Sequence, residues 1–140
     1  MKENKLFLDT NIIIYAYDLS AGKKYEIAKN IIIDLWNSGL GCLSTQVLQE
    51  FFVIVTGKIK NPLDFDSAKL FVKDFLKWNV IINDGQCIIE GIELHKKYKY
   101  SFWDSMIIQA AIKSRAKILL SEDLQSGHVV EGVEIINPFL

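Results

Sequence analysis

The sequence predicts an α/β fold, a central and mostly parallel sheet with helices on both faces, and three observations support this prediction. Short apolar runs of strand length alternate with longer stretches of helical periodicity along the chain. The apolar runs lack a strict apolar–polar alternation, which favours strands buried on both faces. Parallel neighbours need crossover connections, and the helical stretches supply them.

The expected elements follow one another in order. The apolar runs predict strands in residues 5–9, 40–44, 79–84, 117–123 and 133–137. Helical periodicity predicts helices in residues 10–18, 24–39, 45–58, 65–78, 87–99 and 101–115. No repeat, low-complexity tract or Pro/Gly-rich linker divides the chain, so residues 1–140 are expected to form a single domain.

Composition argues against several classes of protein. Sixteen basic and seventeen acidic residues nearly cancel, so the overall charge gives no general attraction to nucleic acid or to an anionic membrane. Cys42 and Cys87 form neither a disulfide framework nor a zinc-site spacing, and we expect buried free thiols. The opening apolar run is broken at Asp9, which fits neither a signal-peptide core nor a membrane span. We therefore expect a cytoplasmic protein.

Two aspartates follow apolar runs directly, where strands of a parallel sheet end. Asp9 ends the first run and Asp123 lies just after residues 117–121. Ligands of open parallel sheets bind beyond the carboxyl ends of the strands, so both positions are candidates for a site. Each also fits a helix or turn cap, because Asp is a favoured N-cap residue. Both interpretations remain open for either residue alone.

Glu50 lies in a predicted helix that is apolar nearly all round. Val47, Val53 and Ile54 share its side of that helix. An unpaired buried carboxylate would cost several kcal/mol or be forced neutral, and coordination of a metal ion would remove this cost. The alternative is an ordinary exposed glutamate.

Asp104 lies near the start of the predicted helix 101–115, which we expect to be amphipathic. Ile107, Ile108 and Ala111 follow it by three, four and seven positions, so its carboxylate is expected to point inward with the apolar stripe. Ser101 precedes it at the spacing of a capping box, which gives a structural alternative.

The four acids are expected at one edge of the sheet, from two strand ends and the early parts of two helices that follow strands. Four close carboxylates repel one another unless a divalent cation neutralises them, and all-oxygen ligands favour Mg²⁺ or Mn²⁺ over zinc. Such a site can orient a phosphodiester and activate a water, which is nuclease chemistry. Thr10, Asn11 and Ser121 are placed to support the carboxylates, or to make ordinary helix-start and turn hydrogen bonds.

Four stretches of the sequence resemble the acidic motifs of the PIN-domain family: "LFLDTNIIIYAYD", "LSTQVLQEFF", "SFWDSMIIQAA" and "ILLSEDLQSG". They occur in the family's order, and the similarity spans essentially the whole chain. In size the chain resembles the stand-alone prokaryotic members, many of which are VapC-type toxins of toxin–antitoxin pairs.

The resemblance implies a three-layer α/β/α fold and a Mg²⁺- or Mn²⁺-dependent endoribonuclease with an RNA substrate. Asp9, Glu50 and Asp104 match the three main acids of the family, and Asp123 matches the fourth, more variable one. Asn11 matches the polar residue after the first acid, and Ser121 stands where the family often has threonine. The resemblance also implies a homodimer and, for a toxin, a small antitoxin partner.

Several residues depart from the family pattern or leave alternatives open. Glu122 adds a carboxylate beside Asp123, and we favour Asp123 as the fourth acid. The near-neutral charge and the single arginine, Arg115, are less basic than expected for a protein that grips RNA. Phe102 and Trp103 flank Asp104 and are candidates for stacking on a base, with core packing expected for at least one.

Two other classes of protein are alternatives to this interpretation. A receiver-like module would need a middle strand ending at Asp84 and would leave Glu50 and Asp104 unexplained. A catalytically inactive RNA-binding or protein-interaction module on the same fold is the main alternative, because a fold does not fix a function.

Overall fold

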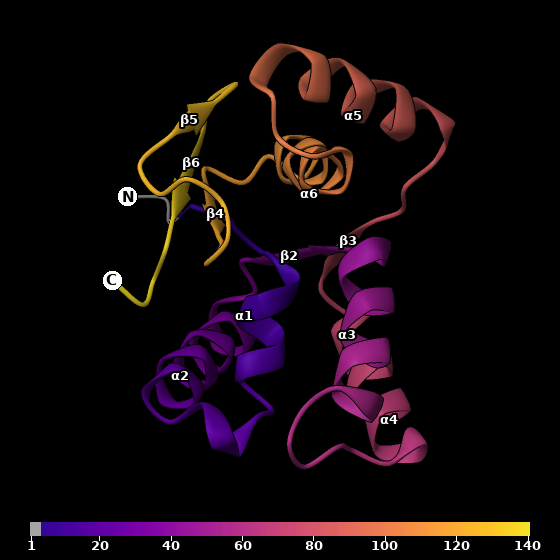
Figure 1. The fold of residues 1–140 in the computed structure, drawn as a ribbon, viewed down its shortest axis with the longest axis vertical. Helices are drawn as coiled ribbons and strands as arrows, with labels where there is room; N and C mark the ends of the chain where they lie inside the picture. The colour runs from indigo at the N-terminus through magenta and orange to yellow at the C-terminus, as the bar shows by residue number, and fades with distance from the viewer. Residues whose placement is uncertain (1–3) are drawn as a thin grey trace.

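The computed structural model describes residues 4–140, and the first three residues of the expected domain lie outside the described residues. Six strands form one sheet with the spatial order β3-β2-β1-β4-β6-β5 (Figure 1). The strands are β1 (Leu6–Leu8), β2 (Gly41–Ser44), β3 (Asn79–Ile81), β4 (Ile118–Leu120), β5 (Val129–Val130) and β6 (Val133–Ile136). The helices are α1 (Thr10–Tyr15), the short 3₁₀ helix η1 (Leu19–Ala21), α2 (Lys23–Ser38), α3 (Thr45–Gly57), α4 (Phe65–Phe75), α5 (Gly85–Tyr98) and α6 (Phe102–Lys113).

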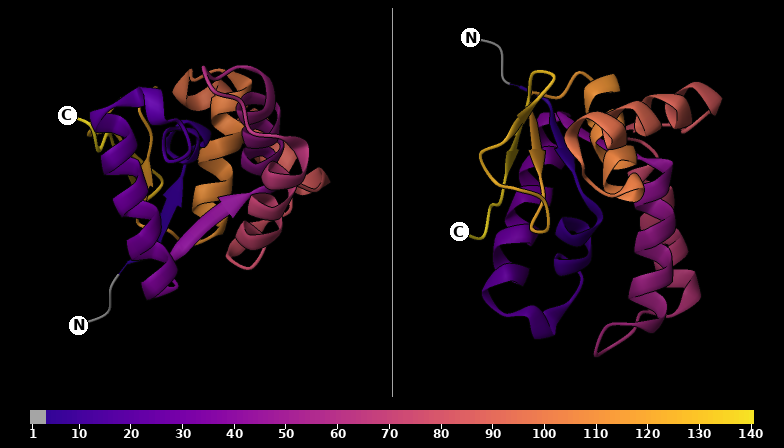
Figure 2. Two further views of the ribbon diagram at one scale, coloured as in Figure 1. Left: turned by 90° about the horizontal axis from the view of Figure 1, so that it is seen from below. Right: turned by 45° about the horizontal axis from the view of Figure 1, so that its top comes forward.

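The arrangement confirms the predicted α/β class with a mostly parallel sheet. Strand β1 pairs in parallel with β2 and β4, β2 with β3, and β4 with β6, whereas β5 runs antiparallel to β6. Helices α2 and α6 lie on opposite sides of strands β1 and β2 (Figure 2), and α5 lies outside α6 (Figure 1). The layers are therefore helix, sheet and helix.

All five predicted strands are present, but the prediction of burial on both faces is wrong for two of them. β3 is an edge strand whose residues are exposed or half-buried. In β6 the buried Val133 and Ile135 alternate with exposed Glu134. The edge position of β3 also argues against a receiver-like module, which would need this strand in the middle of the sheet. Asp84 instead caps α5, accepting the Cys87 N–H at 3.0 Å.

The six predicted helices are present with shifted ends, and the first stops early, at Tyr15. The amphipathic pattern expected for α6 is wrong, because residues 105–111 are all buried. This helix packs against β2 and β4 of the sheet and also against α5, so two neighbouring layers cover it. An apolar stripe therefore does not explain the orientation of Asp104.

The sheet topology creates the site region. From β1 the chain builds β2 and β3 to one side, and it then crosses to place β4 on the other side of β1. The reversal at β1 is the switch point at which open parallel sheets bind ligands. Leu8 and Leu120 are partners in the β1–β4 register, which brings the carboxyl ends of both strands, and thus Asp9 and Ser121, side by side.

The core lies between the layers and holds the strands in register. Phe7, Leu43, Leu119 and Ile135, from four strands, are fully buried. Cys42 and Cys87 are buried and free, as predicted. Among the described residues no helix has both the length and the apolar character needed to cross a membrane.

Candidate active site

Asp9 is the most buried of the four acids, with 7% of its surface exposed. It lies directly after β1 and is also the N-cap of α1, so the capping interpretation is confirmed, and its role in a metal site stays a prediction. The Thr10 N–H donates to Asp9 Oδ1 and the Ser121 hydroxyl to Asp9 Oδ2, each at 2.7 Å. Burial raises the pKa of Asp9 from 3.8 to about 6; these two donors oppose the rise, and the negative charges of Asp104 and Glu50 add to it.

Glu50 is half-buried in the second turn of α3 and faces α1. The Thr10 hydroxyl donates to Glu50 Oε1 at 2.5 Å, and Gln46 Nε2 donates to Glu50 Oε2 at 3.3 Å. Thr10 therefore links the two acids, with its N–H on Asp9 and its hydroxyl on Glu50. The alternative of an ordinary exposed glutamate is wrong.

Asp104 is half-buried in the first turn of α6. Its N–H donates to Ser101 Oγ at 3.1 Å, which is one half of a capping box. The other half is not formed, because among residues 4–140 no donor makes a hydrogen bond to the Asp104 carboxylate. That carboxylate is close enough to Asp9 to raise the pKa of Asp9.

Asp123 is exposed and is held by Asn11 from the first turn of α1. Asn11 Nδ2 donates to Asp123 Oδ2 at 3.0 Å, and Asn11 Oδ1 accepts the Glu122 N–H at 3.2 Å. The Glu122 carboxylate instead accepts hydrogen bonds from the Tyr15 hydroxyl, at 2.6 Å, and from Lys24 Nζ. The two adjacent acids thus have separate partners.

The structure brings Asp9, Glu50 and Asp104 within electrostatic range, but it does not gather the four carboxylates around one point. Within residues 4–140 no group of three or more Asp, Glu, His or Cys side chains is arranged to hold a metal ion. Glu50 faces Thr10 and Gln46, and Asp123 lies at the surface with Asn11.

The chemistry of these residues nevertheless fits a hard divalent cation. All the candidate donors are carboxylate oxygens, which favour Mg²⁺ or Mn²⁺. No basic side chain in the described part of the chain pairs with any of the four acids; the ion pairs there are Lys24–Glu122, Lys77–Asp74 and Lys97–Glu131. A bound cation would compensate the buried charge of Asp9 and its repulsion from Asp104 and Glu50, which together raise the pKa of Asp9.

Sequence reasoning missed three side chains that hold the acids in place. Gln46 precedes Glu50 by one helical turn, a spacing that was visible in the sequence, and it also donates to the Trp103 carbonyl at 3.3 Å. Tyr15 and Lys24 hold Glu122 from α1 and α2, and no local pattern indicated either contact. Of the two aromatic candidates for base stacking, Trp103 is 64% exposed and Phe102 is half-buried.

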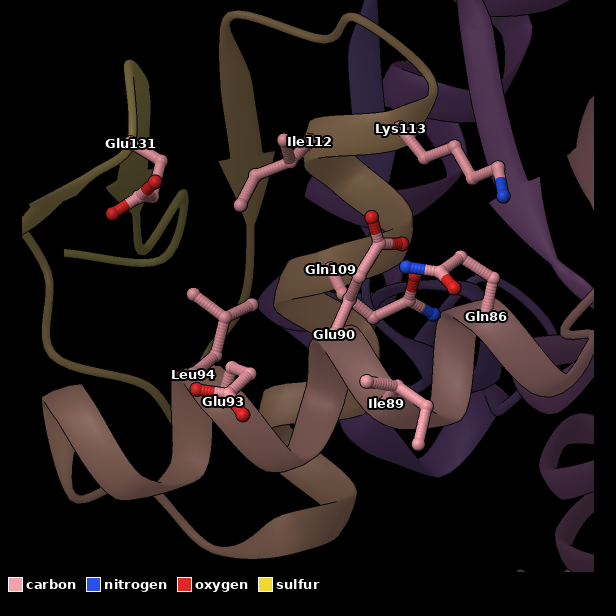
Figure 3. A pocket seen from close by; sticks show the side chains of 9 residues that line it. All are labelled: Gln86, Ile89, Glu90, Glu93, Leu94, Gln109, Ile112, Lys113 and Glu131. Atoms are coloured by element: carbon pink, nitrogen blue, oxygen red, sulfur yellow. The ribbon is translucent and has the colours of Figure 1, made fainter.

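A pocket of about 350 Å³ lies elsewhere, between α5 and α6 (Figure 3). Its polar lining includes Gln86, Glu90, Gln109 and Lys113. None of the four acids lines it, so it is separate from the candidate active site.

Comparison with known proteins identifies the family. The PIN domain model matches residues 6–129. No curated protein matches the chain in sequence. A toxin–antitoxin complex from Klebsiella pneumoniae contains a chain with a TM-score of 0.66 and 20% identity, covering 96% of this chain and 97% of that one.

Two further solved structures share the fold. DNA-bound VapBC from Salmonella typhimurium has a TM-score of 0.61 and 24% identity, with 95% of this chain and 97% of that chain covered. VapC20 of Mycobacterium tuberculosis, a toxin that cleaves the sarcin-ricin loop, has a TM-score of 0.62 and 16% identity, with 85% and 90% covered. The family match spans most of the sequence, and the chain therefore belongs to the PIN domain family.

Proposed function

We propose that this chain is a Mg²⁺- or Mn²⁺-dependent endoribonuclease that hydrolyses RNA phosphodiester bonds and is the toxin of a toxin–antitoxin pair. The observation that carries the proposal is the state of Asp9, a buried carboxylate with a raised pKa, two neighbouring acids and no basic partner in the described chain. A buried charge in that setting is costly unless a proton or a cation compensates it. Membership of the PIN family and the fold shared with toxin structures support the same assignment.

In this proposal the metal ligands are Asp9, Glu50, Asp104 and Asp123. The cation, when bound, supplies a water of lowered pKa and stabilises the leaving oxygen. Ser121 and Thr10 fix the Asp9 carboxylate, and Gln46 holds Glu50. Asn11 holds Asp123 at the surface. The two contacts on Asp9 restrict its carboxylate rotamer in advance. Glu50 would have to turn from Thr10 and Gln46 toward a bound cation.

Cleavage of a structured RNA tests the proposal. The parent protein is compared with Asp9→Asn and Asp104→Asn in Mn²⁺ or Mg²⁺, with and without chelator. Asp66→Asn is the matched control, because Asp66 is also an acid in the first turn of a helix, α4, but is exposed and is not among the acids that raise the pKa of Asp9. We expect chelator to abolish cleavage and each site variant to lower it by about 100-fold or more, since loss of a group behind a ligand already costs roughly 10–100-fold. Activity unchanged in both site variants would overturn the mechanism.

The alternative function is a catalytically inactive RNA-binding or protein-interaction module. The observation that favours it is the engagement of Glu50 by Thr10 and Gln46, which turns this carboxylate toward protein donors. RNA binding by the parent without cleavage in either metal would select this alternative. A gel-shift measurement beside the cleavage assay separates the two.

We also propose that the protein forms a homodimer, binds a small antitoxin and acts in the cytoplasm. Apolar side chains at the surface support the association. A groove of about 410 Å³ between α3 and α4 is lined mainly by Leu48, Phe52, Val53 and Val72, and Val53 is 55% exposed. Light scattering of the parent and of Val53→Asp tests self-association, with a dimer expected for the parent and a monomer for the variant.

A further inference from the structure

Glu122, in the turn after β4, is held by contacts with two helices and the C-terminal segment. Its carboxylate pairs with Lys24, from the first turn of α2, and accepts a hydrogen bond from the Tyr15 hydroxyl of α1. Lys24 Nζ also lies over two aromatic rings, 5.2 Å from the centroid of Tyr15 and 5.8 Å from that of Phe139. The two rings themselves meet edge to face at 5.3 Å. We call Tyr15, Lys24 and Glu122 the latch.

The latch is connected to three residues that serve the proposed metal site, namely Asn11, Ser121 and Asp123. Asn11 and Tyr15 are four residues apart on α1 and therefore share one face of it. Asn11 holds the Glu122 N–H and the Asp123 carboxylate, while Tyr15 holds the Glu122 carboxylate. Ser121, immediately before, donates to Asp9 and accepts the Leu124 N–H at 3.3 Å. The direction of Glu122 is thereby coupled to the positions of Ser121 and Asp123.

We propose that Lys24 is a positioning residue. Its ion pair keeps the Glu122 carboxylate in the latch, so that Asp123 is the fourth acid of the site and the Ser121 hydroxyl stays hydrogen-bonded to Asp9. This inference rests on the proposed metal site. Without Lys24, Glu122 loses its only basic partner among the described residues, and the turn of residues 121–123 loses one of its anchors. The Tyr15 hydroxyl and Asn11 then remain as the side-chain partners of Glu122.

Mn²⁺ titration by calorimetry tests the proposal, because the two explanations predict opposite changes in Mn²⁺ affinity when Lys24 is removed. Loss of a positive charge near a cation site would, by charge alone, strengthen Mn²⁺ binding. Loss of a positioning residue weakens it. We expect Lys24→Met to weaken Mn²⁺ binding by roughly tenfold and Lys24→Arg to bind Mn²⁺ nearly as tightly as the parent. The double variant Lys24→Met with Glu122→Gln should recover much of the lost affinity, because the glutamine side chain keeps an acceptor for the Tyr15 hydroxyl but carries no unpaired charge.

Lys29→Met is the matched control. Lys29 lies on the same helix with its Nζ 5.4 Å from the centroid of the Tyr25 ring, and it pairs with no acid in the described chain. It should leave Mn²⁺ binding unchanged. Binding by Lys24→Met as tight as the parent's, or a double variant no better than the single one, overturns the proposal.

Hydrogen exchange separates this proposal from the proposed nuclease function. In the metal-free protein, Lys24→Met should speed exchange of the Glu122 and Leu124 amides, which donate to Asn11 Oδ1 and Ser121 Oγ. A parent that cleaves no RNA but shows these changes would remove the nuclease assignment and leave the positioning role intact. Amides with unchanged exchange in Lys24→Met would overturn the positioning role even in an active nuclease.

Discussion

Asp9 and Glu122 follow neighbouring strands of the same sheet, yet the protein treats their charges in opposite ways. Burial would raise the pKa of Glu122, but the hydrogen bonds from Lys24 and Tyr15 outweigh it and the pKa is lowered. Burial raises the pKa of Asp9 to about 6; in the described chain its donors, the Ser121 hydroxyl and the Thr10 N–H, are neutral and oppose the rise only in part, and the charges of Asp104 and Glu50 add to it. The fold compensates one carboxylate internally and leaves the other dependent on a proton or a cation. Whether a carboxylate has a basic partner in the protein therefore distinguishes a structural acid from a candidate metal ligand better than its position after a strand does.

The largest effect that tests this comparison is the pH dependence of stability that arises from Asp9. Its pKa is higher in the folded protein than in the unfolded chain, so the folded state binds the proton more tightly. Stability from this group is therefore greatest when Asp9 is protonated, falls as pH rises from about 4 through 6, and is then constant. A rise from 3.8 to about 6 corresponds to roughly 3 kcal/mol of destabilisation at neutral pH.

Asp9→Asn isolates this contribution from those of acids with lowered pKa, such as Glu122, whose stabilisation is lost as pH falls. In urea denaturation with chelator present, we expect Asp9→Asn to be more stable than the parent at pH 7.5 and the margin to vanish near pH 4. Mn²⁺ at about 100 times its Kd should then stabilise the parent by about 2.7 kcal/mol and leave the variant unchanged. A margin that is the same at both pH values would show that Asp9 is already compensated.

A smaller effect is expected from Ser121→Ala, which removes a neutral donor from Asp9 and leaves the acid in place. Its hydroxyl opposes the rise in the pKa of Asp9, so the variant should need a higher pH to ionise Asp9 and bind Mn²⁺. We expect about tenfold weaker Mn²⁺ binding near pH 7. The pH profile of binding by calorimetry is the measurement.

Ser114→Ala is a closely matched control for that variant. Both serines are buried; each hydroxyl donates at 2.7 Å, Ser114 to the Ala111 carbonyl and Ser121 to Asp9, and each accepts a backbone N–H at 3.3 Å. Equal losses of Mn²⁺ binding in the two variants would mean that general destabilisation, and not the contact with Asp9, explains the effect.

The comparison also explains which features the sequence could predict. The order of strands and helices follows from hydrophobic periodicity, which is a local signal. The place of Asp9 at the carboxyl end of its strand follows from that order. The two-residue strand β5 is too short to carry a periodic signal. The burial of α6 on two sides depends on α5 and the sheet together, so the residues of α6 alone misled the prediction of an amphipathic helix. The Glu122 carboxylate pairs with Lys24, 98 residues earlier, and no pattern around residue 122 indicates that contact.

The smallest loss of activity among the proposed metal ligands is expected at Asp123, which is neither buried like Asp9 nor paired with a lysine like Glu122. It is exposed, and in the described chain it has no basic partner and its side chain accepts one hydrogen bond, from Asn11 at 3.0 Å. Water screens a charge at such a position, so its interaction with a cation is worth about 1 kcal/mol, and Asp123→Asn should lower RNA cleavage by only about fivefold. The free energy of unfolding should stay unchanged, because an asparagine oxygen still accepts from Asn11.

Glu122→Gln should behave in the opposite sense, with lower stability and nearly unchanged cleavage, since its amide keeps the Tyr15 contact that holds the turn. A larger loss of cleavage in Glu122→Gln than in Asp123→Asn would reverse the assignment of the two acids.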